Sequence, residues 1–222
     1  MGRHIDWFLS KAPKKPWKSG YLQVLILAFD TATDVATVAL ARDGEVLGER
    51  ASRAVRVLQD VEELLEAADA RSDEVEGIAV GTGPGSYTGL RMGLVTARTL
   101  SFSLGVPVAG VSTLDALAAG APGAVPVIDG KRKEVFTLVR GEPSCVAAES
   151  FAVEKEATYV GDGAVRFRAE IEARGGVVPP DDDERHVPWA RHHAALARDF
   201  GDAEAAAPIY LRVPDAEKAL SR

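Results

Sequence analysis

The sequence has little cysteine, an excess of acidic over basic residues and no long apolar run. One cysteine, Cys145, permits no disulfide within the chain, and free thiols are typical of a reducing compartment. The net charge of -7 argues against broad nucleic-acid binding through the surface of the chain, because such binding needs excess Lys and Arg. No apolar run is long enough to span a bilayer. We therefore expect a cytoplasmic globular protein with no membrane span.

Groups that usually carry catalysis or bind metals are also scarce. The four histidines are His4, His186, His192 and His193, and no His-x-x-x-His pair exists among them to hold a metal. His192 and His193 are adjacent and point away from each other on a helix, so we expect both to be solvated. No Ser/His/acid arrangement and no activated cysteine can be recognised. The sequence therefore predicts no catalytic residue and no metal ligand.

What the chain does have is strands and helices in alternation. Residues from about 55 follow a helical period, and a second helix runs from Ser86 to about Leu104. The last helix is expected within residues 186–201, after a surface loop at 179–188. Apolar, β-rich stretches that we interpret as strands occupy residues 24–30, 35–41, 45–52, 77–82 and 106–112. We therefore expect an α/β fold in which helices pack on a partly parallel sheet.

The same pattern then occurs a second time. The stretch "VPVIDGKRKEVFTLVRG" contains an apolar strand that ends in Asp129, as "LILAFD" ends in Asp30. Later, "YVGDGAV" repeats the strand and the Gly-x-Gly of "AVGTGPG". Two repeats in the same order predict a duplicated βββαβα unit with a shorter second copy. We divide the chain into a mobile extension at 1–22, a first lobe at 23–120 and a reduced second lobe at 121–222.

Four polar residues at strand ends form a candidate phosphate or nucleotide site. Asp30, Thr31 and Thr33 lie in the turn after the first strand, and Asp129 has the matching place in the second copy. Duplicated α/β phosphotransferases place an Asp there for metal-bound phosphate, and hydroxyls for phosphate oxygens. The alternative is that these side chains satisfy backbone groups of a tight turn. Because no second phosphate loop is present, we favour the turn.

The glycine-rich stretch "VGTGPGSYTGLR" has neither the dinucleotide-binding spacing nor the Gly-Lys-Ser/Thr of a P-loop. Ser86 is a candidate N-cap, and the exposed N–H groups beside it could hold an anion. Pro84, however, removes one donor from the middle of that cradle. A sharp strand-to-helix turn is therefore the simpler explanation of the glycines.

The helix that begins at Ser86 is apolar on nearly every side. Gly89, Gly93 and Ala97 form a ridge of small residues, which lets a second helix approach closely. The residues on its far side include Met92, Val95, Thr99 and Phe102. Because the shortened second half offers little material to bury such a helix, we expect a partner helix to cover it. A bulky residue in place of Gly93 should then block association while the monomer stays folded.

Four stretches of the sequence resemble one family. They are "ILAFDTATDVATVAL", "GTGPGSYTGLRMGL", "GVPVAGVSTLDALA" and "VIDGKRKEVF", and they are similar to the bacterial TsaB (YeaZ) family, whose G-x-G-P-G-[SP]-[FY]-T-G-[LV]-R pattern is highly specific. The similarity runs from about Val24 to Phe136 and returns at "APIYLR". It implies a two-lobed actin-like fold of the Hsp70/sugar-kinase, ribonuclease H-like type. It also implies a non-catalytic role in making threonylcarbamoyladenosine on tRNA, at the adenosine beside the anticodon.

The resemblance also implies partners. TsaB-like chains pair with TsaD, the related subunit that binds metal and performs the transfer, and TsaE joins them in the presence of ATP. A homodimer is also possible, and tRNA is reached through the complex. We expect ATP, threonylcarbamoyl-adenylate and metal on the partner subunits rather than on this chain. Carried over from the family, the interface candidates are Val57, Val61, Leu65, Tyr87, Leu90, Met92, Gly93, Leu94 and Ala97.

Three positions depart from the family pattern. Arg53 stands where a His is usual, Gln59 where a Pro is usual and Lys131 where an Arg is usual. With Arg132 and Lys133, Lys131 forms a basic turn that is either solvated or in contact with a phosphate backbone or an acidic partner. Two other functions stay open as alternatives. One is an ATP-dependent phosphotransferase of the same fold that uses the two strand-end Asp residues, and the other is a glycoprotein peptidase.

Overall fold

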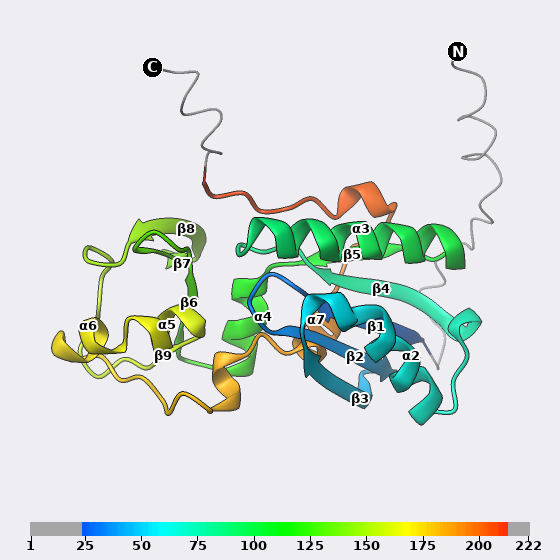
Figure 1. The fold of residues 1–222 in the computed structure, drawn as a ribbon, viewed down its shortest axis with the longest axis horizontal. Coiled ribbons are helices and arrows are strands. Elements are labelled where there is room, and N and C mark those ends of the chain that lie inside the picture. The colour runs from blue at the N-terminus through cyan, green and yellow to red at the C-terminus, as the bar shows by residue number, and fades with distance from the viewer. Residues whose placement is uncertain (1–23, 213–222) are drawn as a thin grey trace, which may run out of the picture.

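The computed structural model describes residues 24–212 and contains two β-sheets that lie side by side (Figure 1). The predicted extension at 1–22 lies outside the described residues. Within the described part of the chain, no helix combines the length and the apolar character that a membrane span requires.

The first sheet has five strands in the order β3-β2-β1-β4-β5. Strands β1, β2 and β3 pair antiparallel, whereas β4 runs parallel to β1 and β5 runs parallel to β4. The strands are β1 (Leu25–Asp30), β2 (Ala36–Arg42), β3 (Glu45–Ser52), β4 (Val75–Gly81) and β5 (Val108–Val111). All five predicted strands are confirmed, with ends that differ by up to two residues.

The second sheet repeats this order without its fifth strand. Its strands are β6 (Val125–Asp129), β7 (Glu134–Val139), β8 (Glu142–Ala147) and β9 (Tyr159–Val160). They follow the order β8-β7-β6-β9, with β6 antiparallel to β7 and parallel to β9. The predicted duplication with a shortened second copy is therefore confirmed. The predicted boundary between the lobes, at residues 120 and 121, stays a prediction.

Helices cover both faces of the first sheet. The α-helices are α2 (Val57–Ala67), α3 (Tyr87–Leu104), α4 (Thr113–Gly120), α5 (Asp162–Arg166), α6 (Arg168–Ala173) and α7 (Ala190–Leu196). Short 3-10 helices are η1 (Ala54–Arg56), η2 (Ser72–Glu74), η3 (Glu184–His186) and η4 (Ala203–Ala205). Residues of α2 and α3 share one apolar cluster with β1, β2 and β4. Helix α7 shares a second cluster with these strands, although it comes from the second half of the sequence.

Small side chains allow α7 to lie close to the sheet. Ala28, Ala39, Ala79 and Ala109 form the surface that it contacts. The last helix is shorter than the predicted 186–201 at both ends. Pro188 holds the preceding Val187 in an extended conformation, and Asp199 has a positive φ of 51° beyond the last turn.

Helix α3 begins and ends where the sequence predicts. The Ser86 hydroxyl accepts a hydrogen bond from the Gly89 N–H, which confirms the N-cap, and Gly105 ends the helix at φ 67°. The expectation that the small-residue ridge faces a partner is wrong. A Cβ atom on Gly89 would lie 2.0 Å from the Thr31 carbonyl oxygen, and one on Gly93 would lie 2.4 Å from the Thr31 Oγ1. The ridge therefore packs on the turn after β1, which the sequence pattern did not link to it.

We predict that Gly93→Leu destabilises the folded chain instead of blocking association alone. A larger side chain must displace Thr31 or push α3 off the sheet, and such overpacking costs roughly 1–3 kcal/mol. Chemical denaturation measures the change in the free energy of unfolding. Val95→Leu, at an exposed position of the same helix, is the matched control and should change it by less than about 0.5 kcal/mol. Equal stability of the two variants would contradict this packing.

Candidate functional site

The carboxylate of Asp30 is enclosed by protein groups at the end of β1. Its side chain is buried, with the residue only 1% exposed. Oδ1 accepts a hydrogen bond of 2.6 Å from the Ala32 N–H, and Oδ2 accepts one of 2.6 Å from the Thr113 hydroxyl. The His193 Nε2 lies 2.8 Å from the same Oδ2. Both carboxylate oxygens are therefore occupied by groups of the chain.

These contacts keep Asp30 ionised. Burial works to raise the pKa of Asp30, but the charge of His193 and the hydrogen bonds from His193, Thr113 and Ala32 outweigh it, so the pKa lies below its ordinary value. A charged group in a buried site is tolerated because it is paired and hydrogen-bonded.

The expectation that His192 and His193 are solvated is wrong. His193 is 0% exposed, because α7 lies against the sheet and turns this ring toward β1. Its Nδ1 lies 3.3 Å from the Trp189 carbonyl oxygen. His192 is half-buried, and burial lowers its pKa. No spacing in the sequence links His193 to Asp30, since the two are joined only by the docking of α7.

The hydroxyls near Asp30 serve the backbone. Thr31 donates to the Gly89 carbonyl oxygen at 2.7 Å, and Thr33 donates to the Val35 carbonyl oxygen at 2.8 Å. Together with the bond from Asp30 to the Ala32 N–H, these contacts confirm the interpretation that the side chains satisfy a tight turn.

The glycines of "GTGPG" are explained by close approach to this turn. A Cβ atom on Gly81 would lie 2.3 Å from the Asp30 carboxyl carbon, and one on Gly85 would lie 2.2 Å from the Ala32 carbonyl oxygen. Larger residues at these positions would displace the turn. The stretch is therefore a packing device rather than a phosphate cradle.

Asp129 has the matching place at the end of β6, with different partners. Its Oδ2 lies 3.0 Å from the Lys131 Nζ and 2.6 Å from the Arg166 Nη1. Burial works to raise the pKa of Asp129, but the hydrogen bonds from Lys131 and Arg166 outweigh it and lower the pKa. The neighbouring Asp162 accepts the Asp129 N–H at 2.9 Å, and burial raises the pKa of Asp162.

These residues do not fit a metal–nucleotide site. His193 already occupies the Asp30 carboxylate, and the cations Lys131 and Arg166 surround Asp129. A divalent cation would have to displace one and overcome the charge of the others. Within residues 24–212, no group of three or more His, Cys, Asp and Glu side chains is arranged to hold a metal ion.

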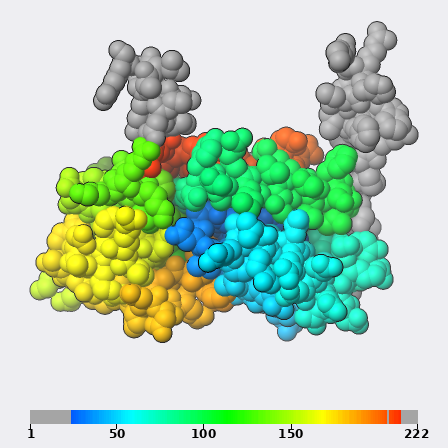
Figure 2. All heavy atoms as spheres, viewed as in Figure 1, coloured from blue at the N-terminus to red at the C-terminus, as the bar shows by residue number. Residues whose placement is uncertain are grey.

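The outer face of α3 and the adjoining η1 and α2 expose large apolar side chains. Figure 2 shows α3 in green and α2 in cyan on the face toward the viewer. We call this surface the α2–α3 face. Its exposed side chains are Val55 at 78%, Leu58 at 58%, Tyr87 at 54%, Val95 at 59% and Phe102 at 54%. Single exposed apolar residues are common, but such a group on adjoining elements is typical of an interaction surface.

Six of the nine sequence-predicted interface residues belong instead to the core of the chain. They are Val57, Val61, Leu90, Gly93, Leu94 and Ala97. The chain itself therefore covers this side of α3, because the sheet lies beneath it. Leu65 and Met92 are half-buried, and Tyr87 is exposed. The helical period placed the small ridge and the far-side residues on opposite sides of α3, but the partner was assigned to the ridge side, which is buried.

A family model described as TsaD, tRNA N6-adenosine threonylcarbamoyltransferase, matches residues 32–157, more than half of the chain. The tRNA threonylcarbamoyladenosine biosynthesis protein TsaB of Bacillus subtilis (strain 168) is 37% identical over 121 residues, which are 50% of this chain and 53% of that protein. The protein of the same name from Escherichia coli (strain K12) is 37% identical over 121 residues, 50% of this chain and 52% of that protein.

A solved structure extends this similarity beyond the matched half. YeaZ from Pseudomonas aeruginosa is 29% identical with a TM-score of 0.71, and the match covers 85% of this chain and all of that structure. The chain belongs to the TsaB (YeaZ) family. It therefore has the two-lobed actin-like fold that the motifs imply. The TsaB-family chain spans about half the length of the curated TsaB relatives it matches.

We predict that the Asp30–His193 pair makes a large contribution to the stability of this TsaB-family protein. His193→Ala leaves a buried carboxylate without its partner and should cost about 3–5 kcal/mol. Denaturation of Asp30→Asn, His193→Ala and the double variant should give a coupling energy above about 1 kcal/mol. His192→Ala is the neighbouring control and should cost less. If His193→Ala is no more destabilising than the control, the pair contributes little.

The same carboxylate predicts a pH dependence. Because folding lowers the pKa of Asp30 from 3.8, its stabilisation is fully present above that pH and is lost as pH falls through the lower folded pKa. The stability difference between the wild type and Asp30→Asn should therefore be constant from about pH 7 to pH 5 and shrink below about pH 4. Urea midpoints across this range measure it. A difference that stays the same at every pH would contradict an ionised Asp30.

Proposed function

We propose that this chain is a non-catalytic subunit that binds and activates TsaD, the transferase that attaches threonylcarbamoyl to the adenosine beside the anticodon of tRNA. Support comes from the relatives, which are named biosynthesis proteins for threonylcarbamoyladenosine, and from the transferase family model. TsaE joins the complex in the presence of ATP. The nucleotide, the threonylcarbamoyl-adenylate and the metal are held by the partner subunits.

The observation that carries the proposal is the apolar α2–α3 face. Burying a large apolar side chain completely is worth about 1.5–3 kcal/mol, so five half-exposed side chains can contribute several kcal/mol to association. The exposed Arg91 and Arg98 of α3 suit the rim of such an interface, where Arg is enriched. An apolar contact of this kind should resist moderate salt.

A helix pair explains the choice of partner. TsaD is related to this family, so it carries equivalent helices, and two such pairs can pack face to face around a pseudo-two-fold axis. A second copy of this chain can use the same face in a homodimer. The heterodimer is the working form, because the chain's own strand-end carboxylates are occupied by His193, Lys131 and Arg166.

The alternative of an ATP-dependent phosphotransferase depends on Asp30 and Asp129. Neither carboxylate is open to a metal-bound phosphate, for the reasons given above. A metal-dependent peptidase requires metal ligands, and among the described residues no group of three or more His, Cys, Asp and Glu side chains is arranged to hold a metal ion. Both alternatives therefore rank below the subunit role, and we expect no micromolar ATP binding by the isolated chain.

We predict that Val95→Glu prevents association with the TsaD of the same organism. Val95 is 59% exposed in the middle of α3, so the monomer should stay folded, while a carboxylate within an apolar interface should weaken binding at least about 100-fold. Calorimetry and size-exclusion chromatography measure the association. Val177→Glu, at a position 49% exposed in the second lobe, is the matched control. Unchanged association of Val95→Glu would place the contact elsewhere.

A further inference from the structure

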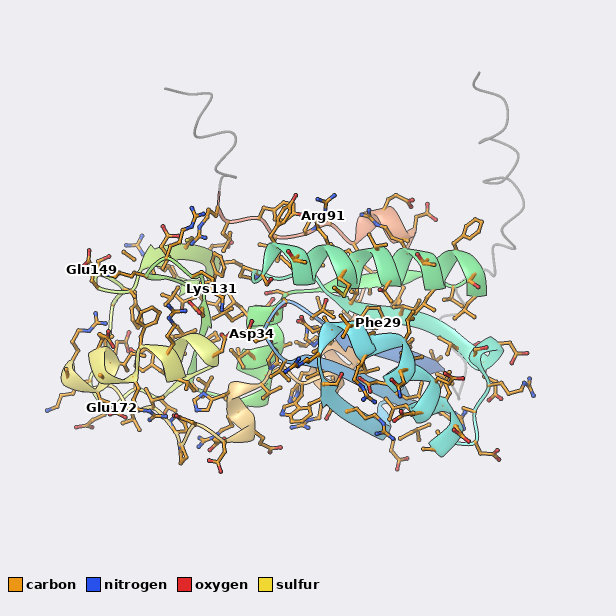
Figure 3. All side chains as sticks on the ribbon, in the orientation of Figure 1. Phe29, Asp34, Arg91, Lys131, Glu149 and Glu172 are labelled. Atoms are coloured by element: carbon orange, nitrogen blue, oxygen red, sulfur yellow. The ribbon has the colours of Figure 1, made fainter. Side chains whose placement is uncertain are left out.

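Two tyrosine rings lie exposed at the start of α3. Tyr87 is 54% exposed and Tyr210 is 50% exposed, and their ring centroids are 5.5 Å apart. The Arg91 guanidinium lies 5.3 Å from the Tyr87 ring centroid, and its Nη1 donates to the Tyr87 hydroxyl at 3.0 Å. Figure 3 shows Arg91 on the side of α3 where the C-terminal segment passes. The two rings are tilted by 33° to each other, and the guanidinium lies over the Tyr87 ring, so the pair combines exposed aromatic surface with a cation.

The segment after η4 connects this aromatic pair to the second lobe. It runs along α3 toward β7 and β8 (Figure 1). Leu211 packs against the apolar cluster of Ile128 and Phe136, while its neighbour Tyr210 stays exposed. Two residues on, the Arg212 Nη2 donates to the Gly130 carbonyl oxygen at 2.6 Å. Gly130 lies in the turn between β6 and β7. The Cα atoms of Tyr210 and Arg212 are at most about 7 Å apart, so the bond from Arg212 places the aromatic pair near this turn.

That turn presents cations on a strained backbone. Lys131, Arg132 and Lys133 have φ angles of 58°, 51° and 61°. This left-handed conformation is unfavourable for residues other than Gly, Asn and Asp. Hydrogen bonds fix the turn, among them the one from the Lys131 N–H to the Asp129 Oδ1 at 2.8 Å. Strain of this kind is concentrated at functional sites, and here three consecutive basic residues share it.

Acidic residues neutralise part of this charge. The Lys131 Nζ lies 3.0 Å from the Asp129 carboxylate and 3.4 Å from the Asp34 carboxylate of the first lobe, as Figure 3 shows for Lys131 and Asp34. Arg212 pairs with Glu134. Lys133, in contrast, is exposed and makes no ion pair with any described residue. Arg91 is also exposed, and it contacts the ring and the hydroxyl of Tyr87.

We propose that this strip, formed by Arg91, Tyr87, Tyr210 and the turn at 131–133, binds a single-stranded segment of RNA. Unpaired bases stack on exposed aromatic rings, and Lys and Arg beside them hold the phosphates. Paired bases offer no free face for such stacking. The strip differs from the α2–α3 face in character, because it combines rings with cations where that face centres on aliphatic Val55, Leu58 and Val95.

The RNA class rests on the proposed function, in which the substrate is tRNA and the modified adenosine lies in a loop. The net charge of -7 makes binding by the chain alone weak, so the strip contributes an additional contact within the complex. The strip adjoins the α2–α3 face, because Tyr87 and Arg91 belong to both, whereas Tyr210 and the turn at 131–133 belong to the strip alone.

Binding is measured on the full chain by fluorescence anisotropy, with a labelled RNA stem–loop as the probe and a fully paired duplex of equal length for comparison. Tyr210→Ala should weaken stem–loop binding about fivefold or more, and Tyr210→Phe, which keeps the ring, should not. Lys133→Ala should weaken stem–loop binding and lower by about one the slope of the logarithm of affinity against the logarithm of salt concentration. Lys155 is an exposed lysine elsewhere in the second lobe, and Lys155→Ala should change neither quantity. Residues 1–23 contain five Lys and Arg residues. They are unchanged in every variant, so they do not account for a difference in RNA binding between variants.

Several outcomes overturn the proposal. Equal binding of all four variants would exclude the strip. Equal affinity for duplex and stem–loop, with loss only in Lys133→Ala, would show an unspecific anion surface. Loss of TsaD association in Tyr210→Ala with unchanged RNA binding would assign the strip to a protein partner.

The same assays separate this proposal from the proposed function. Val95→Glu should lose TsaD association and keep stem–loop binding, while Tyr210→Ala should do the reverse. If Val95→Glu keeps its partner but Tyr210→Ala loses RNA, the interface assignment fails and the RNA surface stands.

Discussion

The buried contact between the Asp30 carboxylate and the His193 ring ties the late helix α7 to the first strand of the chain. His193 lies 2.8 Å from Oδ2, and other long-range bonds hold the same helix region, including the one from the Thr37 hydroxyl to the Pro188 carbonyl oxygen. Through them α7 covers a sheet face of alanines that would otherwise be exposed. The contact therefore holds α7 on the first lobe, and His193 occupies the carboxylate at the end of β1.

The occupied carboxylate and the exposed helix face are the two features on which the proposed function depends. With Asp30 held by His193, and Asp129 by Lys131 and Arg166, the strand ends serve the fold. Helix α3 presses its glycines onto the Thr31 turn and leaves its other side to solvent. These two features underlie the proposal that the chain acts by association with a partner. The strip of tyrosines and basic residues adjoins the exposed helix face and adds cations to it.

Much of the fold could be read from the sequence because it depends on local patterns. Apolar strands ending in Asp30 and Asp129 marked the two copies, and Ser86 and Gly105 set the ends of α3. The candidate site was harder. The ridge of Gly89 and Gly93 was recognised, but its direction was wrong, since small residues admit a strand turn as readily as a second helix.

The sequence by itself determined the family, the duplicated strand order and the ends of α3, since motif spacing, hydrophobic period and capping act within a few residues. Only the tertiary structure decided which side of α3 is buried, that His193 meets Asp30, and that Tyr210 lies against Tyr87. These are contacts between residues far apart in the chain. They arise from the way helices and a C-terminal segment dock on a sheet, and no local pattern encodes that docking.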